Sequence, residues 1–222
     1  MLTFADIKND PQIRTYIKKA DEVLESIGYT EHSFAHVTRV AAEAKLILAA
    51  RGYSERDQEL AQIAGYIHDI GNIVNRVDHA QSGAIMAFRI LDRLGMDPEE
   101  IAVIVSAIGN HDEGTAYPVH PVAAALILAD KTDVRRTRVR VKAGQEAFDK
   151  DIHDRVNYAV EKARTTLEPD GSAILLSLTI DTTICPVMDY FEIFLNRMLL
   201  CRKAADKLEM RFRLMINGQE LL

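Results

Sequence analysis

Hydrophobic residues recur every three to four positions along most of the first 167 residues, which is the period of amphipathic helices packed on a core. Asp10-Pro11 and Asp97-Pro98 mark two helix starts, because aspartate caps a helix and proline suits its first position. Glycines follow several of the periodic segments and predict their ends. Helices are therefore expected over about residues 11–27, 34–51, 55–70, 78–94, 98–108, 121–134 and 151–167.

The hydrophobic pattern changes after the turn-rich residues 168–171. Alternation over residues 174–181 predicts a largely buried strand, residues 186–206 form a helical pattern, and residues 208–217 alternate as a half-buried strand. The expected fold class is mainly α, with an all-helical core and a small C-terminal β-α-β unit. We divide the chain into a helical domain of residues 1–170 and a small α/β tail of residues 171–222.

The tail leads to an expectation about assembly. Two strands joined by a helical crossover are expected to be parallel, and two such strands alone make an unstable sheet. Residues 138–141 alternate too and are a candidate third strand, but this segment is short and strongly charged. Pairing between two copies of the tail is preferred, which predicts a homodimer held by residues 172–222.

Composition narrows the class of protein. The 222 residues are 48% hydrophobic and 27% charged, as in a packed globular protein, and the net charge of −6 does not favour a nucleic-acid partner. No apolar run reaches the roughly 20 residues that span a bilayer, so no membrane partner is expected. Cys185 and Cys201 lack metal-type spacing and the N-terminus lacks an export pattern, which together favour the cytoplasm.

Candidate chemistry lies in histidines and aspartates near predicted helix ends. His68 and Asp69 interrupt a buried apolar run, and Asp130 ends another, where an uncompensated carboxylate would be costly. A divalent metal would compensate the burial, since imidazole and carboxylate suit borderline transition metals. A hydrogen-bonded core histidine or an isolated structural ion pair is the alternative at each position.

The ordered set His36, His68-Asp69 and Asp130 resembles the HD superfamily over about residues 30–140. The segments HVTRVA and HDIG look like that superfamily's first-histidine helix and its His-Asp doublet. The resemblance implies an all-helical domain around the site and hydrolysis of phosphomonoesters or phosphodiesters.

Two further segments, DHAQSGA and NHDEGTAYP, are similar to motifs of the HD-GYP branch and imply that His79 and His111 are also ligands. The chain departs from that branch at Asn72, where a lysine is frequent, at Asn110 in place of a histidine, and at Ala116 in place of a glycine. These departures argue against cyclic dinucleotide hydrolysis.

The resemblance implies one or two divalent ions (Fe, Mn, Co, Ni or Zn, with Mg as a further candidate). The metal ligands it implies are His36, His68, Asp69, His79, His111 and Asp130, with Asp69 bridging and with Asp69, His79 and His111 as catalytic residues. Asn72, Lys131, Arg135 and Arg136 are expected to bind substrate; the two arginines belong to a basic run at residues 133–142. His32, one turn before His36, stays outside the metal set.

The predicted function is metal-dependent hydrolysis of a small phosphorylated substrate, such as a nucleotide, by metal-activated water. Two alternatives use the same residues. The six-residue set also resembles HD-fold di-iron oxygenases, and Asn72 and Asn110 leave open a catalytically silent nucleotide-binding module.

Overall fold

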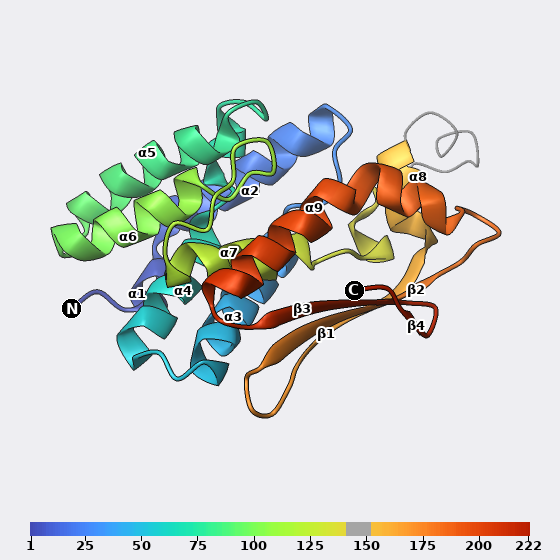
Figure 1. Ribbon diagram of the computed structural model, residues 1–222. Coiled ribbons are helices and arrows are strands. Elements are labelled where there is room, and N and C mark those ends of the chain that lie inside the picture. The colour runs from blue at the N-terminus through green and yellow to red at the C-terminus, as the bar shows by residue number, and fades with distance from the viewer. Residues whose placement is uncertain (141–151) are drawn as a thin grey trace.

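A computed structural model describes residues 1–140 and 152–222, without the side chains of residues 152–154. Most of the described chain is helical (Figure 1). The α-helices are α1 (Phe4–Asn9), α2 (Pro11–Ser26), α3 (Phe34–Ala50), α4 (Glu55–Ile67), α5 (His79–Arg93), α6 (Pro98–Gly109), α7 (Pro121–Lys131), α8 (Ile152–Ala159) and α9 (Val187–Lys207). Two short 3₁₀ helices are η1 (Ile70–Ile73) and η2 (Arg136–Arg138), and the strands are β1 (Val160–Leu167), β2 (Ala173–Ile180), β3 (Arg211–Ile216) and β4 (Gln219–Glu220).

Local capping explains why the predicted helices begin where they do. Asp10 accepts hydrogen bonds from the backbone N–H groups of Gln12 and Ile13, and Pro11 occupies the first position of α2. Asp97 and Pro98 repeat this arrangement at α6. The predicted starts of these helices are confirmed, whereas α1, which is capped by Thr3, was not predicted.

Helix α7 lies at the centre of the helical core and packs against α3, α4, α6 and α9. Every residue from Val122 to Lys131 is buried, which explains its near-continuous apolar sequence. Beside it, α3 and α4 approach closely at Gly65, where an added Cβ would lie 2.9 Å from the Cα of Ala41. The close packing of these three helices holds His36, the His68-Asp69 doublet and Asp130 in one region.

The C-terminal sheet has the order β1-β2-β3-β4. Strands β2 and β3 are parallel and joined through α9, as predicted, and β1 pairs antiparallel with β2. Helix α9 packs on α7 and on β2 and β3, so it joins the helical core to the sheet (Figure 1). None of the helices in the described residues is long and apolar enough to cross a membrane.

The predicted helix over residues 151–167 is wrong in its second half, where the chain forms β1. Glu161 and Lys162 favour a helix locally, but pairing with β2 decides the structure of this segment, as is common for strands. The candidate strand at residues 138–141 is also not formed in its described part, since Arg138 ends η2; residue 141 lies outside the described residues.

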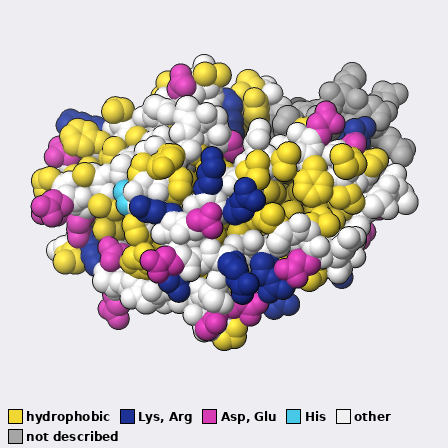
Figure 2. Space-filling view, in the orientation of Figure 1, with side chains coloured by type: hydrophobic (Ala, Val, Ile, Leu, Met, Phe, Trp, Pro, Cys, Tyr) yellow, Lys and Arg dark blue, Asp and Glu magenta, His cyan; other side chains and the backbone are white. Residues whose placement is uncertain are grey.

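The sheet acquires its additional strands, β1 and β4, from the same chain. Strand pairing between two copies is therefore not needed to complete it, which removes the original reason for expecting a dimer. Hydrophobic side chains do gather on the face that carries α8 and α9 (Figure 2), and α9 exposes Met188 and Leu195. The homodimer and the division at residue 170 remain predictions.

Candidate metal centre

The six predicted metal ligands come together from the ends of five helices. His36 lies in the first turn of α3, His68 and Asp69 follow α4, His79 begins α5, His111 follows α6 and Asp130 is the penultimate residue of α7. All six are buried, with exposed fractions between 0% and 8%. Such burial of two carboxylates requires compensating positive charge or hydrogen bonds.

Asp69 lies between two pairs of histidines. Its Oδ2 atom is 3.6 Å from His36 Nε2 and 3.2 Å from His68 Nε2. Its Oδ1 atom is 3.6 Å from His79 Nε2 and 3.9 Å from His111 Nε2. One carboxylate thus faces four imidazole nitrogens, two on each oxygen, which is an arrangement suited to a carboxylate shared between two cations.

Asp130 adds a second carboxylate on one side of this arrangement. Its Oδ1 atom lies 3.3 Å from His36 Nε2 and 3.6 Å from His68 Nε2. The candidate ligand atoms of His36, His68 and Asp130 all lie within 4.8 Å of one another, as do those of His68, Asp69 and His111. Each of these groups of three could hold a metal ion.

The second ring nitrogen of each histidine fixes its tautomer. A carbonyl or carboxylate accepts the Nδ1–H of all four rings: Asp133 for His36 (2.8 Å), Gly65 for His68 (2.9 Å), Arg76 for His79 (3.0 Å) and Ile108 for His111 (2.6 Å). Every Nε2 atom is therefore directed at the centre of the cluster, where it can bind a metal. Metal-ligating histidines are held in this way in proteins.

Three of the inward-facing atoms, His36 Nε2, His68 Nε2 and Asp69 Oδ2, are buried without a hydrogen-bond partner among the described residues. The Nε2 atoms of His79 and His111 lie only 3.2 Å apart, and Arg76 Nη1 lies 3.2 Å from His79 Nε2. Leaving such groups uncompensated is costly, and a cation satisfies them together. The residues present therefore fit one or two divalent metals.

Electrostatics lead to the same conclusion. Burial alone would lower the pKa of His68, but the neighbouring Asp69 and Asp130 carboxylates raise it to about 10. Burial would likewise raise the pKa of Asp69, yet His68 and His36 hold it well below its ordinary value. The cluster favours a positive charge between these groups, which a proton or a metal can supply.

Asp133 is a member of the site that sequence reasoning missed. Its side chain is fully buried, and its Oδ2 atom accepts the Nδ1–H of His36 at 2.8 Å. The guanidinium of Arg135 donates to both of its oxygens, at 2.6 and 2.9 Å, and Arg39 lies 3.3 Å away. The sequence signal for Asp133 was its position one turn after Asp130, just beyond the end of the buried helix α7.

Two of the predicted substrate-binding residues lie beside the centre. Asn72 is buried and donates to the backbone oxygen and to Oδ1 of Asp69, at 2.9 and 3.0 Å, so it orients that carboxylate. Lys131 Nζ lies 2.6 Å from Asp130 Oδ2 and lines the adjoining cavity. Asn72 is not among the residues that line the cavity.

The other two, Arg135 and Arg136, do not line the cavity either. Arg135 is engaged with Asp133, whereas Arg136 donates to the backbone oxygen of Tyr158 and stacks on the ring of that residue. Substrate contact by these arginines stays a prediction that their positions do not favour. Lys142, at the end of the same basic run, lies outside the described residues.

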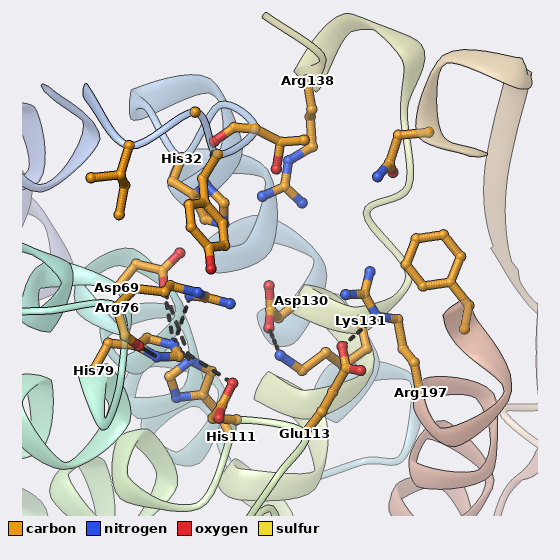
Figure 3. A pocket seen from close by; sticks show the side chains of 17 residues that line it. His32, Asp69, Arg76, His79, His111, Glu113, Asp130, Lys131, Arg138 and Arg197 are labelled. Atoms are coloured by element: carbon orange, nitrogen blue, oxygen red, sulfur yellow. Dashed lines mark hydrogen bonds and ion pairs between the residues drawn. The ribbon is translucent and has the colours of Figure 1, made fainter. Parts of the chain in front are cut away.

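A cavity of about 520 Å³ opens beside the cluster and is lined by Asp69, His79, His111 and Asp130 (Figure 3). His32 lines it, with Nδ1 bonded to the backbone oxygen of Thr30. Arg138, which belongs to the predicted basic run at residues 133–142, lines it as well, and so do Arg76 and Arg197, which were not singled out in the sequence. Arg197 belongs to α9, so the C-terminal part of the chain contributes directly to this wall.

Comparison with known proteins places the centre in a family context. A family model described as HD domain matches residues 33–135, a segment that contains all six candidate ligands. An uncharacterized protein of Methanocaldococcus jannaschii is 23% identical over 183 residues, covering 72% of this chain and 70% of the relative. A crystal structure of a predicted HD superfamily hydrolase from an uncultured Thermotogales bacterium is 25% identical, with a TM-score of 0.44 over 56% of this chain and 67% of that chain.

Proposed function

Because this chain carries an HD domain in residues 33–135, we propose that it is a metal-dependent phosphohydrolase. The proposed reaction is cleavage of a phosphomonoester or phosphodiester, such as a nucleotide, by metal-activated water. The observation that carries the proposal is the set of four imidazoles whose Nε2 atoms face Asp69 and Asp130, with three buried atoms lacking a partner among the described residues.

The distances suggest how the ligands divide between two ions. His36, His68 and Asp130 would hold one ion, and His79 and His111 would hold the other. Asp69 would bridge them, because its two oxygens face different histidine pairs. Bound metals would polarise a phosphoryl oxygen and lower the pKa of a coordinated water toward neutrality.

The protein's own groups would position these components. Asn72 holds Asp69 Oδ1, and Arg76 Nη1 donates to Asn72 Oδ1 at 3.3 Å, so a short chain of hydrogen bonds fixes the bridging carboxylate. Arg76 and Lys131 also line the cavity, where their charges favour an anionic phosphate group next to the ligands. Burial of the cluster excludes bulk water and strengthens these interactions.

A reconstitution experiment tests the proposal. The full chain would be loaded separately with Mn²⁺, Zn²⁺, Co²⁺, Ni²⁺ or Fe²⁺ and assayed with phosphomonoesters, phosphodiesters and nucleotides for phosphate release, with O₂ uptake recorded in parallel. Asp69→Ala should abolish metal retention and turnover, whereas Asp92→Ala, a matched change at an exposed aspartate, should preserve both. Oxygen uptake without phosphate release, or full metal occupancy in Asp69→Ala, would contradict the proposal.

The proposal includes a cytoplasmic location. Cys185 and Cys201 are both buried free thiols, as suits a reducing compartment. Cell fractionation of the natural producer tests it, and recovery of the protein outside the cytoplasm would contradict it.

A further inference from the structure

Two arginine side chains enter the cavity from elements beyond the matched domain. Arg138 ends η2, and Arg197 lies on α9. Both guanidinium groups point into the space beside Asp130 and Lys131 (Figure 3). The other two cations of the cavity are already engaged at the metal centre, since Arg76 contacts His79 at 3.2 Å and Lys131 pairs with Asp130.

Arg138 is a buried cation without a close carboxylate of its own. Only 7% of the residue is exposed, and backbone carbonyl oxygens of Glu31 and Asp133 accept from its Nε and Nη1 at 2.9 and 3.0 Å. The nearest carboxylate, on Asp133, is 3.9 Å away and is shared with Arg135. Its remaining nitrogen, Nη2, has no hydrogen-bond partner in the described part of the chain. A buried charge of this kind is costly unless a counter-ion binds.

Arg197 is held rigidly with its outer edge available. Its Nε donates to Glu113 Oε1 at 2.5 Å, and its guanidinium carbon lies 4.3 Å from the ring centroid of Phe194, which is 2% exposed. Neither of its terminal nitrogens has a hydrogen-bond partner among the described residues. Burial lowers the pKa of Arg138, the carboxylates of Asp133, Asp130 and Asp69 raise it, and the charge of Arg197 lowers it by a smaller amount, so the two cations repel each other weakly.

We infer that Arg138 and Arg197 form a second anion-binding subsite, and that the substrate carries a carboxylate or phosphate group in addition to the phosphate ester that is cleaved. The inference rests on the proposed function, which places the scissile phosphate at the metal ligands. An anion between the two guanidinium groups relieves their repulsion, and their planar forks match carboxylate and phosphate oxygens. The volume of about 520 Å³ lies in the range of small-molecule sites and exceeds the space that one phosphoryl group needs.

Binding of non-hydrolysable phosphonates tests the subsite without relying on turnover. Calorimetry on the metal-loaded full chain would compare propylphosphonate, which has one anionic group, with 3-phosphonopropionate and propane-1,3-bisphosphonate, which carry a second. We expect at least one of the latter two to bind ten-fold or more tightly than propylphosphonate. Whichever compound shows the preference identifies the second group as a carboxylate or a phosphate.

Substitutions on α9 assign that preference to Arg197. Arg197→Gln should reduce the ratio between the affinity for the preferred compound with two anionic groups and the affinity for propylphosphonate to less than three-fold. Arg197→Lys, which keeps the charge but not the planar guanidinium, should retain an intermediate ratio. Arg202→Gln, at an exposed arginine of the same helix, should keep the full ratio. Melting curves would check that each variant folds. If Arg197→Gln does not fold, the test rests on Arg197→Lys, whose affinity ratio should then be at least three-fold lower than that of the unsubstituted protein.

Two results would overturn the subsite alone: equal binding of all three phosphonates to the unsubstituted protein, or an unchanged ratio in folded Arg197→Gln and Arg197→Lys. In both cases the binding of propylphosphonate still supports the proposed function. Failure of all three phosphonates to bind the metal-loaded protein would overturn both the proposed function and the inference that rests on it.

Discussion

Asp133 provides a test of how residues outside the ligand set hold the metal centre. Its buried carboxylate accepts the Nδ1–H of His36 at 2.8 Å, which keeps the Nε2 lone pair directed at Asp69 and Asp130. Asp133→Asn keeps an oxygen that can accept this hydrogen bond but removes the charge. Asp133→Ala removes the acceptor altogether and leaves the imidazole of His36 free to rotate.

The size of the effect follows from these contacts. Loss of the partner behind a ligating histidine costs about 10–100-fold in metal affinity, and each ten-fold change is about 1.4 kcal/mol. We expect Asp133→Asn near the lower end, about 10-fold, because a hydrogen bond survives. Asp133→Ala should approach about 100-fold, or about 2.8 kcal/mol of binding free energy. Arg135, with 23% of its side chain exposed, can turn to solvent in both variants, so its loss of a partner adds little.

Metal affinity would be measured by titrating metal-free protein with Zn²⁺ or Mn²⁺ against a chromophoric chelator. Asp92→Asn makes the same chemical change on the exposed surface of α5 and should bind metal like the unsubstituted protein. If both variants at Asp133 bind metal within two-fold of the unsubstituted protein while remaining folded, the orienting role of Asp133 is refuted. The order of the two effects is equally informative, because tighter binding by the alanine variant would contradict the hydrogen-bond argument.

Four further outcomes are expected. If metal is present at 100 times its Kd for the protein, removing it with a chelator should lower the free energy of unfolding by about 2.7 kcal/mol, or the Tm by about 5–11 °C. Thermal melts measure this change, and an unchanged melt would argue against a bound metal. Gly71→Ala should cost about 3 kcal/mol or more in the same assay, since its Cβ would lie 2.0 Å from the backbone oxygen of His79, whereas Gly109→Ala meets only ordinary contacts and should not. Asp130→Ala should lose phosphate release and metal retention together, and retention of either alone would contradict its assignment as a ligand. Light scattering should give twice the monomer mass if the chain is a homodimer through residues 172–222, and a monomer refutes that prediction.

The positions of the helices were largely predictable from the sequence because their signals are local. A cap such as Asp10, a proline at the next position and a repeat of apolar residues act within one or two turns of the chain. The same holds for the parallel strands β2 and β3, whose alternation and long crossover helix are visible in sequence. Strand β1 was not predictable, because its structure depends on pairing with β2 and some of its residues, such as Glu161 and Lys162, favour a helix.

Three of the six candidate ligands, His68, Asp69 and Asp130, could be singled out in advance, because charged residues within buried apolar runs need compensation wherever the chain places them. His36, His79 and His111 were named from the resemblance of their segments to motifs of the HD superfamily and its HD-GYP branch. Only some of the cations that line the cavity could be named in advance, among them Lys131. Arg135 and Arg136 follow Asp130 closely in sequence, yet their guanidinium groups are engaged by Asp133 and Tyr158. Arg197 lies 67 residues beyond Asp130 and reaches the same cavity, because α9 packs on α7.

The sequence alone therefore determined which residue types must be neutralised in the core, since burial follows from the local hydrophobic pattern. Only the tertiary structure decided which groups neutralise them and which cations remain free for a ligand. The direction of a long side chain depends on the packing of helices distant in sequence, and partner choices such as Asp133 for His36 and Glu113 for Arg197 depend on separations of a few ångströms. No periodicity along the chain encodes those separations.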